Sequence, residues 1–313
     1  MFLHKQLTHR MVIRHDSRFG HIYVPDLRAR IPHERGAYWL RTNSLGFRSD
    51  DEMETERGSR PRVLVYGDSY TAGDGCSNAE RFSDLLARQL DVEVCNLALS
   101  GSGPDQHLLV HEALGTSMGA DLILWLITVH TIERIQLSHR PSIDRTGRLL
   151  LVPRPYFTLD GNELSLHQVP VPRATPLESS EFSPARCEGS APRPYAERLF
   201  KHRSLASLRS TIDAHLGDVK LWMRTLVYRW SGMQLYEEYL DESSPGWKLM
   251  AAIVRRFHAS TRGVPLVVAP LPTYHYYADR LKPIYQRLYA ALADPAAGLH
   301  VLALTSPLSA PTL

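Results

Sequence analysis

The sequence predicts an α/β protein built on a parallel, doubly wound sheet of five strands. Short runs of β-branched and aliphatic residues alternate with longer stretches whose apolar residues recur at helical spacing, which is typical of a parallel sheet covered by helices. The 313 residues, 43% of them hydrophobic, suffice to bury a large core. Because ligands of such sheets bind at the carboxyl ends of the strands, the residues that follow each strand are the first candidates for a site.

The predicted elements are identified in chain order. The first strand (62–66) is apolar and ends at a glycine, and the third (121–127) is almost entirely apolar, as expected of a strand buried on both faces. Pro104 suits the first turn of the helix that it begins. The other predicted elements are a helix at 79–90, a strand at 92–96, helices at 104–117 and 245–261, a strand at 264–269, a helix at 276–293 and a strand at 299–304.

Two segments lie outside this alternation. Residues 1–60 are rich in arginine, histidine and proline, and we expect them to form an N-terminal extension. The sheet domain then spans 61–313, interrupted by an insertion at 137–244. Within the insertion we expect a hairpin around Asp160-Gly161-Asn162, then a proline-rich loop, then mostly helix at 195–239. The insertion either forms a lid over the site or elaborates an edge without touching a substrate.

Composition excludes several classes of partner. A net charge of +3, from 36 basic and 33 acidic residues, is too small to indicate nucleic-acid binding. The three cysteines, Cys76, Cys95 and Cys187, are widely spaced without a Cys-x-x-Cys pair, which favours a reducing compartment. The sequence also lacks a signal-peptide pattern and an apolar run long enough to span a membrane. We therefore expect a cytoplasmic protein whose oligomeric state is left open.

The turn after the first strand carries the strongest functional signal. The stretch Pro61–Gly75 reads PRVLVYGDSYTAGDG, so Ser69 lies where the strand gives way to a helix. At a helix start the first amides lack intrahelical partners and can face a developing oxyanion. The alternative is that Asp68 or Ser69 only caps the helix. The turn is not the Gly-x-Ser-x-Gly elbow of the α/β-hydrolases, because Thr71 stands where that pattern requires glycine.

The heptapeptide 67–73, GDSYTAG, resembles the first motif of the SGNH, or GDSL-like, hydrolases. The resemblance implies a flavodoxin-like three-layer α/β/α sandwich with Ser69 as the nucleophile and Asp68 supporting its turn. An Asn-Ser-x-Gly-Phe-Arg segment precedes the serine motif in many bacterial proteins of this kind, and Asn43–Arg48 is similar to it. The alternative for that segment is a plain loop anchored in the core by Phe47.

Two further motifs of the family have counterparts in this sequence. The segment 96–103 after the second strand resembles the second motif, which implies that the amide of Gly101 helps to form the oxyanion hole. After the third strand, His130 stands where the family has an asparagine. A histidine N–H can donate to an oxyanion in place of an amide, so His130 is the candidate donor. Alternatively, His130 serves as a partner for loop carbonyls or for Glu133.

The fourth family element, an Asp-x-x-His segment that supplies the general base, is not found up to Leu313. Three explanations stay open: a segment beyond Leu313 supplies it, the enzyme is degenerate, or another histidine substitutes. His275 follows the fourth strand and is the best internal candidate, with His107 and His111 behind it. Without a base near the serine, general-base assistance of about 10²–10⁴-fold is lost.

The resemblance implies a serine-dependent hydrolase of carboxylic (O-acyl) esters of a carbohydrate or another small metabolite, acting through an acyl-serine. An acyltransferase of the same lineage and a catalytically impaired binding module are the alternatives. We expect no cofactor, because the glycines around Gly101 lack the spacing of a dinucleotide fingerprint. We also expect no metal, because the histidines are dispersed.

Overall fold

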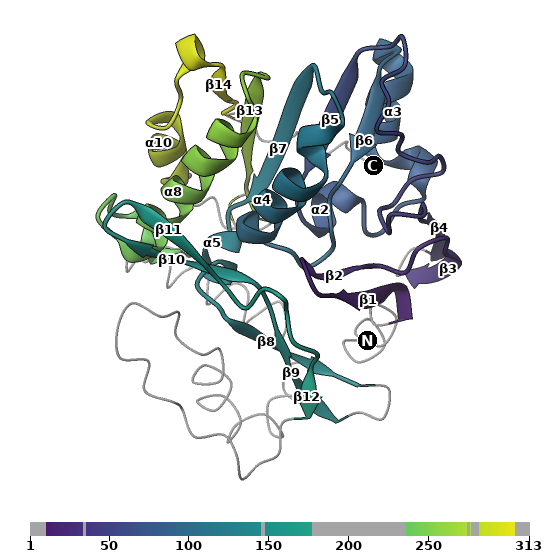
Figure 1. Cartoon of the computed structure of the whole chain (residues 1–313), viewed down its shortest axis with the longest axis horizontal. Helices are drawn as coiled ribbons and strands as arrows, with labels where there is room; N and C mark the ends of the chain where they lie inside the picture. The colour runs from purple at the N-terminus through teal and green to yellow at the C-terminus, as the bar shows by residue number, and fades with distance from the viewer. Residues whose placement is uncertain are drawn as a thin grey trace.

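A parallel sheet of five strands, ordered β14-β13-β7-β5-β6, runs through the middle of the molecule (Figure 1). The computed structural model describes residues 11–33, 36–144, 148–176, 236–273, 276 and 282–303. The strands are β5 (Arg62–Tyr66), β6 (Glu93–Asn96), β7 (Leu122–Thr128), β13 (Leu266–Leu271) and β14 (Leu299–Val301). The predicted five-stranded parallel sheet is confirmed, and with its flanking helices it is consistent with a flavodoxin-like fold.

Helices flank the sheet, and two of them, α4 and α8, lie side by side in front of it (Figure 1). Phe257 of α8 stacks on Trp125 of β7 with ring centroids 4.1 Å apart, and both side chains are fully buried. The described helices are α2 (Ser69–Ala72), α3 (Phe82–Leu90), α4 (Pro104–Ala113), α5 (Thr131–Arg134), α8 (Pro245–Ser260), α10 (Tyr285–Ala290) and the 3₁₀ helices η1 (Asn78–Glu80), η2 (Gly115–Ser117), η3 (Glu237–Tyr239) and η4 (Pro295–Ala297).

Several predicted elements have different boundaries in the structure: the helix expected at 104–117, for example, is α4 followed by η2, and the strand expected at 299–304 is described at 299–301. The helix expected at 79–90 is divided, because Arg81 adopts extended backbone (φ −68°, ψ 149°) between η1 and α3. β13 begins after Pro265, which has no N–H to donate, and continues to Leu271. The helix expected at 276–293 is described only as α10, which begins just after Pro283.

Smaller antiparallel units surround the sheet. The hairpins β1 (Ile13–Asp16) with β2 (Gly20–Tyr23) and β3 (Arg28–His33) with β4 (Gly36–Arg41) precede it. The predicted hairpin around Asp160-Gly161-Asn162 is formed by β10 (Tyr156–Asp160) and β11 (Glu163–His167). β9 (Leu149–Pro153) pairs instead with β8 (His139–Ile143) and β12 (Thr175–Pro176). The helix predicted at 195–239 lies almost wholly outside the described residues.

The sheet places a switch point at β5. The chain passes from β5 to its neighbour β6 on one side and then to β7 on the other, so the connections diverge around the carboxyl end of β5, which is where such sheets bind ligands. Figure 1 shows α2, α5, the β1-β2 hairpin and β8 gathered at this edge. The boundaries proposed for the extension (1–60) and the insertion (137–244) stay predictions.

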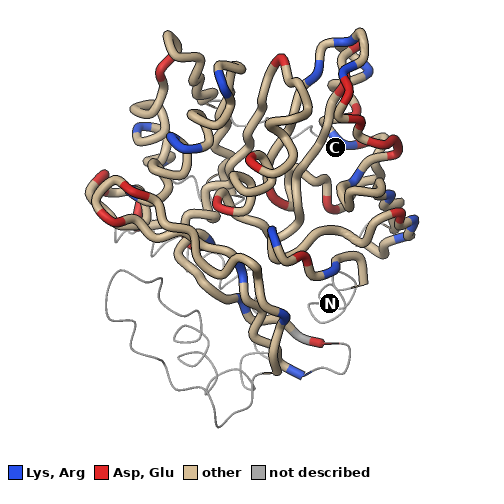
Figure 2. Tube along the Cα trace, in the orientation of Figure 1, with Lys and Arg blue, Asp and Glu red and all other residues tan. Residues whose placement is uncertain are grey.

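Charge and helix length add two observations. Figure 2 shows basic and acidic residues interspersed along the described trace. None of the helices in the described ranges is long and apolar enough to cross a lipid bilayer.

Candidate active site

Ser69 begins α2 in the turn that follows β5. A Cβ on Gly67 would collide with the side chain of Thr71 and come within 2.9 Å of the Leu126 carbonyl oxygen, so this turn requires glycine. Asp68 caps α2, since its Oδ1 accepts from the amide of Tyr70 at 3.1 Å. Ser69 is half-buried, and its hydroxyl forms no hydrogen bond with any described residue. The hydroxyl is therefore available to a ligand or to a base.

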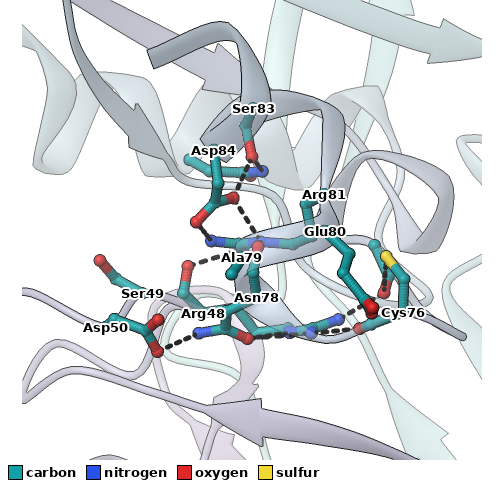
Figure 3. A network of polar contacts seen from close by, with 12 residues as sticks. Arg48, Ser49, Asp50, Cys76, Asn78, Ala79, Glu80, Arg81, Ser83 and Asp84 are labelled. Carbon is teal, nitrogen blue, oxygen red and sulfur yellow. Dashed lines mark hydrogen bonds and ion pairs between the residues drawn. The ribbon is translucent and has the colours of Figure 1, made fainter. Parts of the chain in front are cut away.

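The segment that precedes β5 contacts the loop after α2, and Figure 3 shows Arg48 of this segment in a polar network with Cys76 and Asn78. Phe47 is fully buried and donates its amide to Oδ1 of Asn43 at 3.0 Å, as the core-anchor interpretation expects. The next residue, Arg48, is 0% exposed and donates from Nη1 to the Gly73 carbonyl at 2.6 Å. Its Nη2 donates to the Cys76 carbonyl at 2.8 Å and to Oδ1 of Asn78 at 2.9 Å. Arg48 thus fixes the loop that ends the Ser69 helix.

The Gly101 turn lies next to the Ser69 turn. Gly101 has φ +79°, which favours glycine, and the amide of Leu99 two residues earlier donates to the Gly67 carbonyl at 3.1 Å. Asn96, at the end of β6, donates from Nδ2 to the Thr71 carbonyl at 2.9 Å. The sheet therefore brings the predicted first and second motifs together, although no contact shows that the Gly101 amide binds an oxyanion.

His130 lies beyond β7, on the other side of β5, with its side chain 24% exposed. Its Nε2 is 3.8 Å from Oδ2 of Asp68, which is too long for a hydrogen bond, and its buried Nδ1 has no partner among the described residues. Burial and the nearby charge of Arg134 lower the pKa of His130 to about 3. The ring is therefore neutral near pH 7 and carries one N–H that a ligand could use.

The described residues show one hydrogen bond between His130 and Glu133, and it joins backbone atoms. The ring of His130 forms no hydrogen bond with a loop carbonyl among them, and only the backbone carbonyl of His130 is bonded, by the amide of Glu133 at 3.2 Å. The oxyanion role remains a prediction.

Asp68 connects the first motif to the third. It is 1% exposed and accepts from Oγ1 of Thr128 at 3.0 Å and from Nη1 of Arg134 at 3.2 Å. Burial raises the pKa of Asp68, while Arg134 and these hydrogen bonds oppose the rise. A carboxylate this deeply buried requires such partners, so Asp68 is held at a fixed place beneath the Ser69 turn.

Two arginines that the sequence did not single out complete this side of the site. Arg134 also donates from Nη1 to the Ser102 carbonyl at 2.7 Å. Arg154, just after β9, donates from Nη1 to the Arg134 carbonyl at 2.7 Å and from Nη2 to both carboxylate oxygens of Asp105 at 2.8 Å. Asp105 is 0% exposed. An arginine in a short helix or after a strand is normally a solvated residue, so no sequence signal could have identified either one.

His107 and His111, the secondary candidates for the base, lie in the core. Trp125 can only donate, so its indole N–H at 3.0 Å makes Nδ1 of His107 the acceptor and leaves Nε2–H for the Ser102 hydroxyl at 2.8 Å. Nδ1 of His111 bonds the Tyr66 hydroxyl at 2.9 Å, and its ring stacks on Phe257. Burial lowers the pKa of His107 to about 3 and that of His111 to about 4. Neither is free to serve Ser69.

The leading candidate for the base, His275, lies outside the described residues. Across the part of the chain that the structure describes, no group of three or more His, Cys, Asp and Glu side chains could hold a metal ion.

Comparisons with known proteins leave the family open. No family model and no curated protein matches the sequence. Among solved structures that match, the one titled Crystal Structure of TesA covers 77% of this chain and 76% of that chain, with 12% sequence identity and a TM-score of 0.34. A TM-score this low carries no argument, so the proposals below rest on the residues of this chain.

Proposed function

We propose that the protein is a serine-dependent hydrolase of the SGNH type that cleaves carboxylic (O-acyl) esters of a carbohydrate or another small metabolite. One observation carries the proposal: Ser69 stands at the switch point of the parallel sheet, half-buried, with a hydroxyl that no described residue engages. A serine that served only to cap α2 would use this hydroxyl as the acceptor. In this turn the side chain of Asp68 is the cap instead.

The proposed chemistry proceeds in two steps. The Ser69 Oγ forms a bond to the acyl carbon, the ester C–O bond breaks, and the alcohol leaves with a proton. Water then attacks the acyl-serine, which releases the carboxylic acid and restores the hydroxyl. In the proposal the amides of Ser69 and Gly101, together with an N–H of neutral His130, stabilise the oxyanion. His275 is retained as the candidate that accepts the Ser69 proton.

A fluorophosphonate probe tests the nucleophile directly. The Ser69 oxygen would displace fluoride from phosphorus, so we expect one covalent adduct on the peptide that contains Ser69 by mass spectrometry. Ser69→Ala should abolish the adduct and the hydrolysis of p-nitrophenyl acetate. A matched control is Ser260→Ala, because that hydroxyl donates to the Phe257 carbonyl within α8, away from the site.

The two alternatives give different results in the same assays. A binding module would leave the wild-type protein unlabelled, and that outcome would end the hydrolase proposal. An acyltransferase would label at Ser69 but transfer the acyl group to an added sugar faster than to water.

A further inference from the structure

Arg134 holds the residues next to both proposed catalytic turns. Its Nη1 donates to Oδ2 of Asp68, the residue before Ser69, and to the carbonyl of Ser102, the residue after Gly101. A guanidinium Nη carries two hydrogens, so one nitrogen makes both bonds. A single rigid group thus links the two turns, in addition to the hydrogen bond from the Leu99 amide to the Gly67 carbonyl.

The position of Arg134 is itself fixed from the insertion. Arg154 donates to the Arg134 carbonyl and forms a bidentate pair with Asp105 at the start of α4. Arg154 is 5% exposed and Asp105 is 0% exposed. Because charged hydrogen bonds in a buried setting are strongly directional, the two arginines form a continuous brace from α4 to the Ser69 turn.

Arg134 also influences the ionisation of the titratable groups beside Ser69. Asp68 faces Arg134 and His130 from the third motif and experiences the carboxylate of Asp74 from the loop after α2. Arg134 is the only cation in hydrogen-bond contact with Asp68 among the described residues. The same guanidinium helps to lower the pKa of His130. Without it, Asp68 would lose its main counter-charge, and His130 would become that counter-charge on protonation.

We propose that Arg134 is a positioning residue of the Ser69 site, which fixes the Ser69 turn against the Gly101 turn through Asp68 and Ser102. Its role in catalysis rests on the proposed function, because it presumes that Ser69 is the nucleophile. Its effect on the charges beside Ser69 does not rest on the proposed function, because the titration of His130 measures that effect whether or not the protein has activity.

The kinetic test compares the rate constants for fluorophosphonate labelling of the wild type, Arg134→Gln, Arg134→Lys and Arg57→Gln. Arg57 is a matched control because it forms a bidentate pair with Asp121 at the amino end of β7, away from Ser69. Loss of a hydrogen-bonded charge pair predicts labelling about 10- to 100-fold slower in Arg134→Gln. Arg134→Lys should fall between it and the wild type, and Arg57→Gln should match the wild type.

The second measurement is an NMR titration of the His130 ring. In the wild type we expect no titration of His130 between pH 5 and 8, since its pKa is about 3. In Arg134→Gln the pKa should rise, because a repelling cation is gone and Asp68 needs a partner, while burial, the larger cause, still holds it below 6.5. Circular dichroism checks that the variant is folded, and Arg134→Lys supplies a second folded variant if it is not.

The outcomes separate the two proposals. An unlabelled wild-type protein would refute the proposed function, and the kinetic role of Arg134 with it. A labelled wild type with equal rates in Arg134→Gln and Arg57→Gln would refute the positioning role of Arg134 and leave the proposed function standing. An unchanged His130 titration in Arg134→Gln would refute its role in setting charge.

Discussion

Two arginines hold opposite ends of the Ser69 helix, and they differ in what they contact. Arg48, at the carboxyl end of α2, is 0% exposed and bonds only carbonyl and amide oxygens among the described residues. Arg134, at the amino end, has its side chain 25% exposed and faces the carboxylate of Asp68. One end of the helix is therefore fixed by neutral acceptors and the other by a titratable group.

The contacts of Arg48 therefore do not depend on pH, whereas the contacts of Arg134 depend on the charge of a titratable partner. The acceptors around Arg48 do not change charge with pH, so its contacts should contribute to stability at any pH at which the protein is folded. The contacts of Arg134 involve Asp68 and influence His130, so changes there should also alter how the site responds to pH. We therefore expect changes at Arg48 to act on the whole fold and changes at Arg134 to act more on the site.

The largest expected effect comes from Arg48→Met. The change leaves the carbonyls of Gly73 and Cys76 and the amide oxygen of Asn78 without their buried donor. An unmet buried acceptor costs about 1–3 kcal/mol. The Gly73 carbonyl keeps the Cys76 amide at 3.2 Å and Oδ1 of Asn78 keeps the Arg41 amide at 3.4 Å, so the free energy of unfolding should fall by roughly 3–6 kcal/mol, less than three fully unmet acceptors would cost. Urea denaturation measures the loss.

The control for this prediction is Arg57→Met, which removes a partly exposed ion pair worth less than about 1 kcal/mol. If Arg48→Met destabilised the protein no more than Arg57→Met does, Arg48 would not be a brace of the fold.

The prediction from sequence succeeded where local pattern and topology determine the answer. The apolar runs and the glycine after β5 were enough to predict the parallel sheet, and parallel strands necessarily bring Ser69, Gly101 and His130 to one edge. Arg134 and Arg154 could not be predicted. Their roles depend on which carbonyls and carboxylates the folded chain places within reach, and a pattern of spacing carries no such information.

The buried histidines illustrate the same limit from the opposite direction. His107 resembled a possible base because it follows the second motif. The indole of Trp125, which is 18 residues away in sequence, occupies one of its nitrogens, and Ser102 occupies the other. Only tertiary packing could show that this histidine is a core residue.

Acidification is expected to have a moderate effect on the free energy of unfolding, through two histidines whose pKa values Arg134 influences. Burial lowers the pKa values of His107 and His130 to about 3, and the charge of Arg134 adds to both shifts. A histidine with a lowered folded pKa binds fewer protons when folded, so stability falls as pH drops below the unfolded pKa of about 6.5. From pH 7.0 to 5.5 each should lower the free energy of unfolding by roughly 1 kcal/mol.

Urea denaturation of His107→Gln and His130→Gln at both pH values checks this prediction. Each variant should lose about 1 kcal/mol of the acid sensitivity of the wild type. His111, whose pKa is lowered to about 4, contributes a further loss that both variants retain. The raised pKa values of Asp68 and Asp105 act with the opposite sign, because these groups favour the folded state as pH falls. Equal acid sensitivity in the wild type and both variants would contradict the prediction.

The smallest effect is expected at a further contact between the two turns, which involves the exposed residue Asp74. Ser100 is the residue before Gly101, and its hydroxyl donates to Oδ2 of Asp74 at 2.7 Å. Asp74 is exposed to solvent. Water can replace this bond, so Ser100→Ala should lower the free energy of unfolding by less than about 1 kcal/mol. It should also slow labelling of Ser69 by less than about threefold.

Ser102→Ala is the matched control, because Ser102 flanks Gly101 on the other side and is 0% exposed. Its hydroxyl bonds the Leu99 carbonyl at 2.6 Å and His107 at 2.8 Å, so the same change there should cost more stability than at Ser100. If Ser100→Ala instead slowed labelling as much as Arg134→Gln, the exposed contact would also position the turns. The Arg134 guanidinium would then not be the main determinant of their geometry.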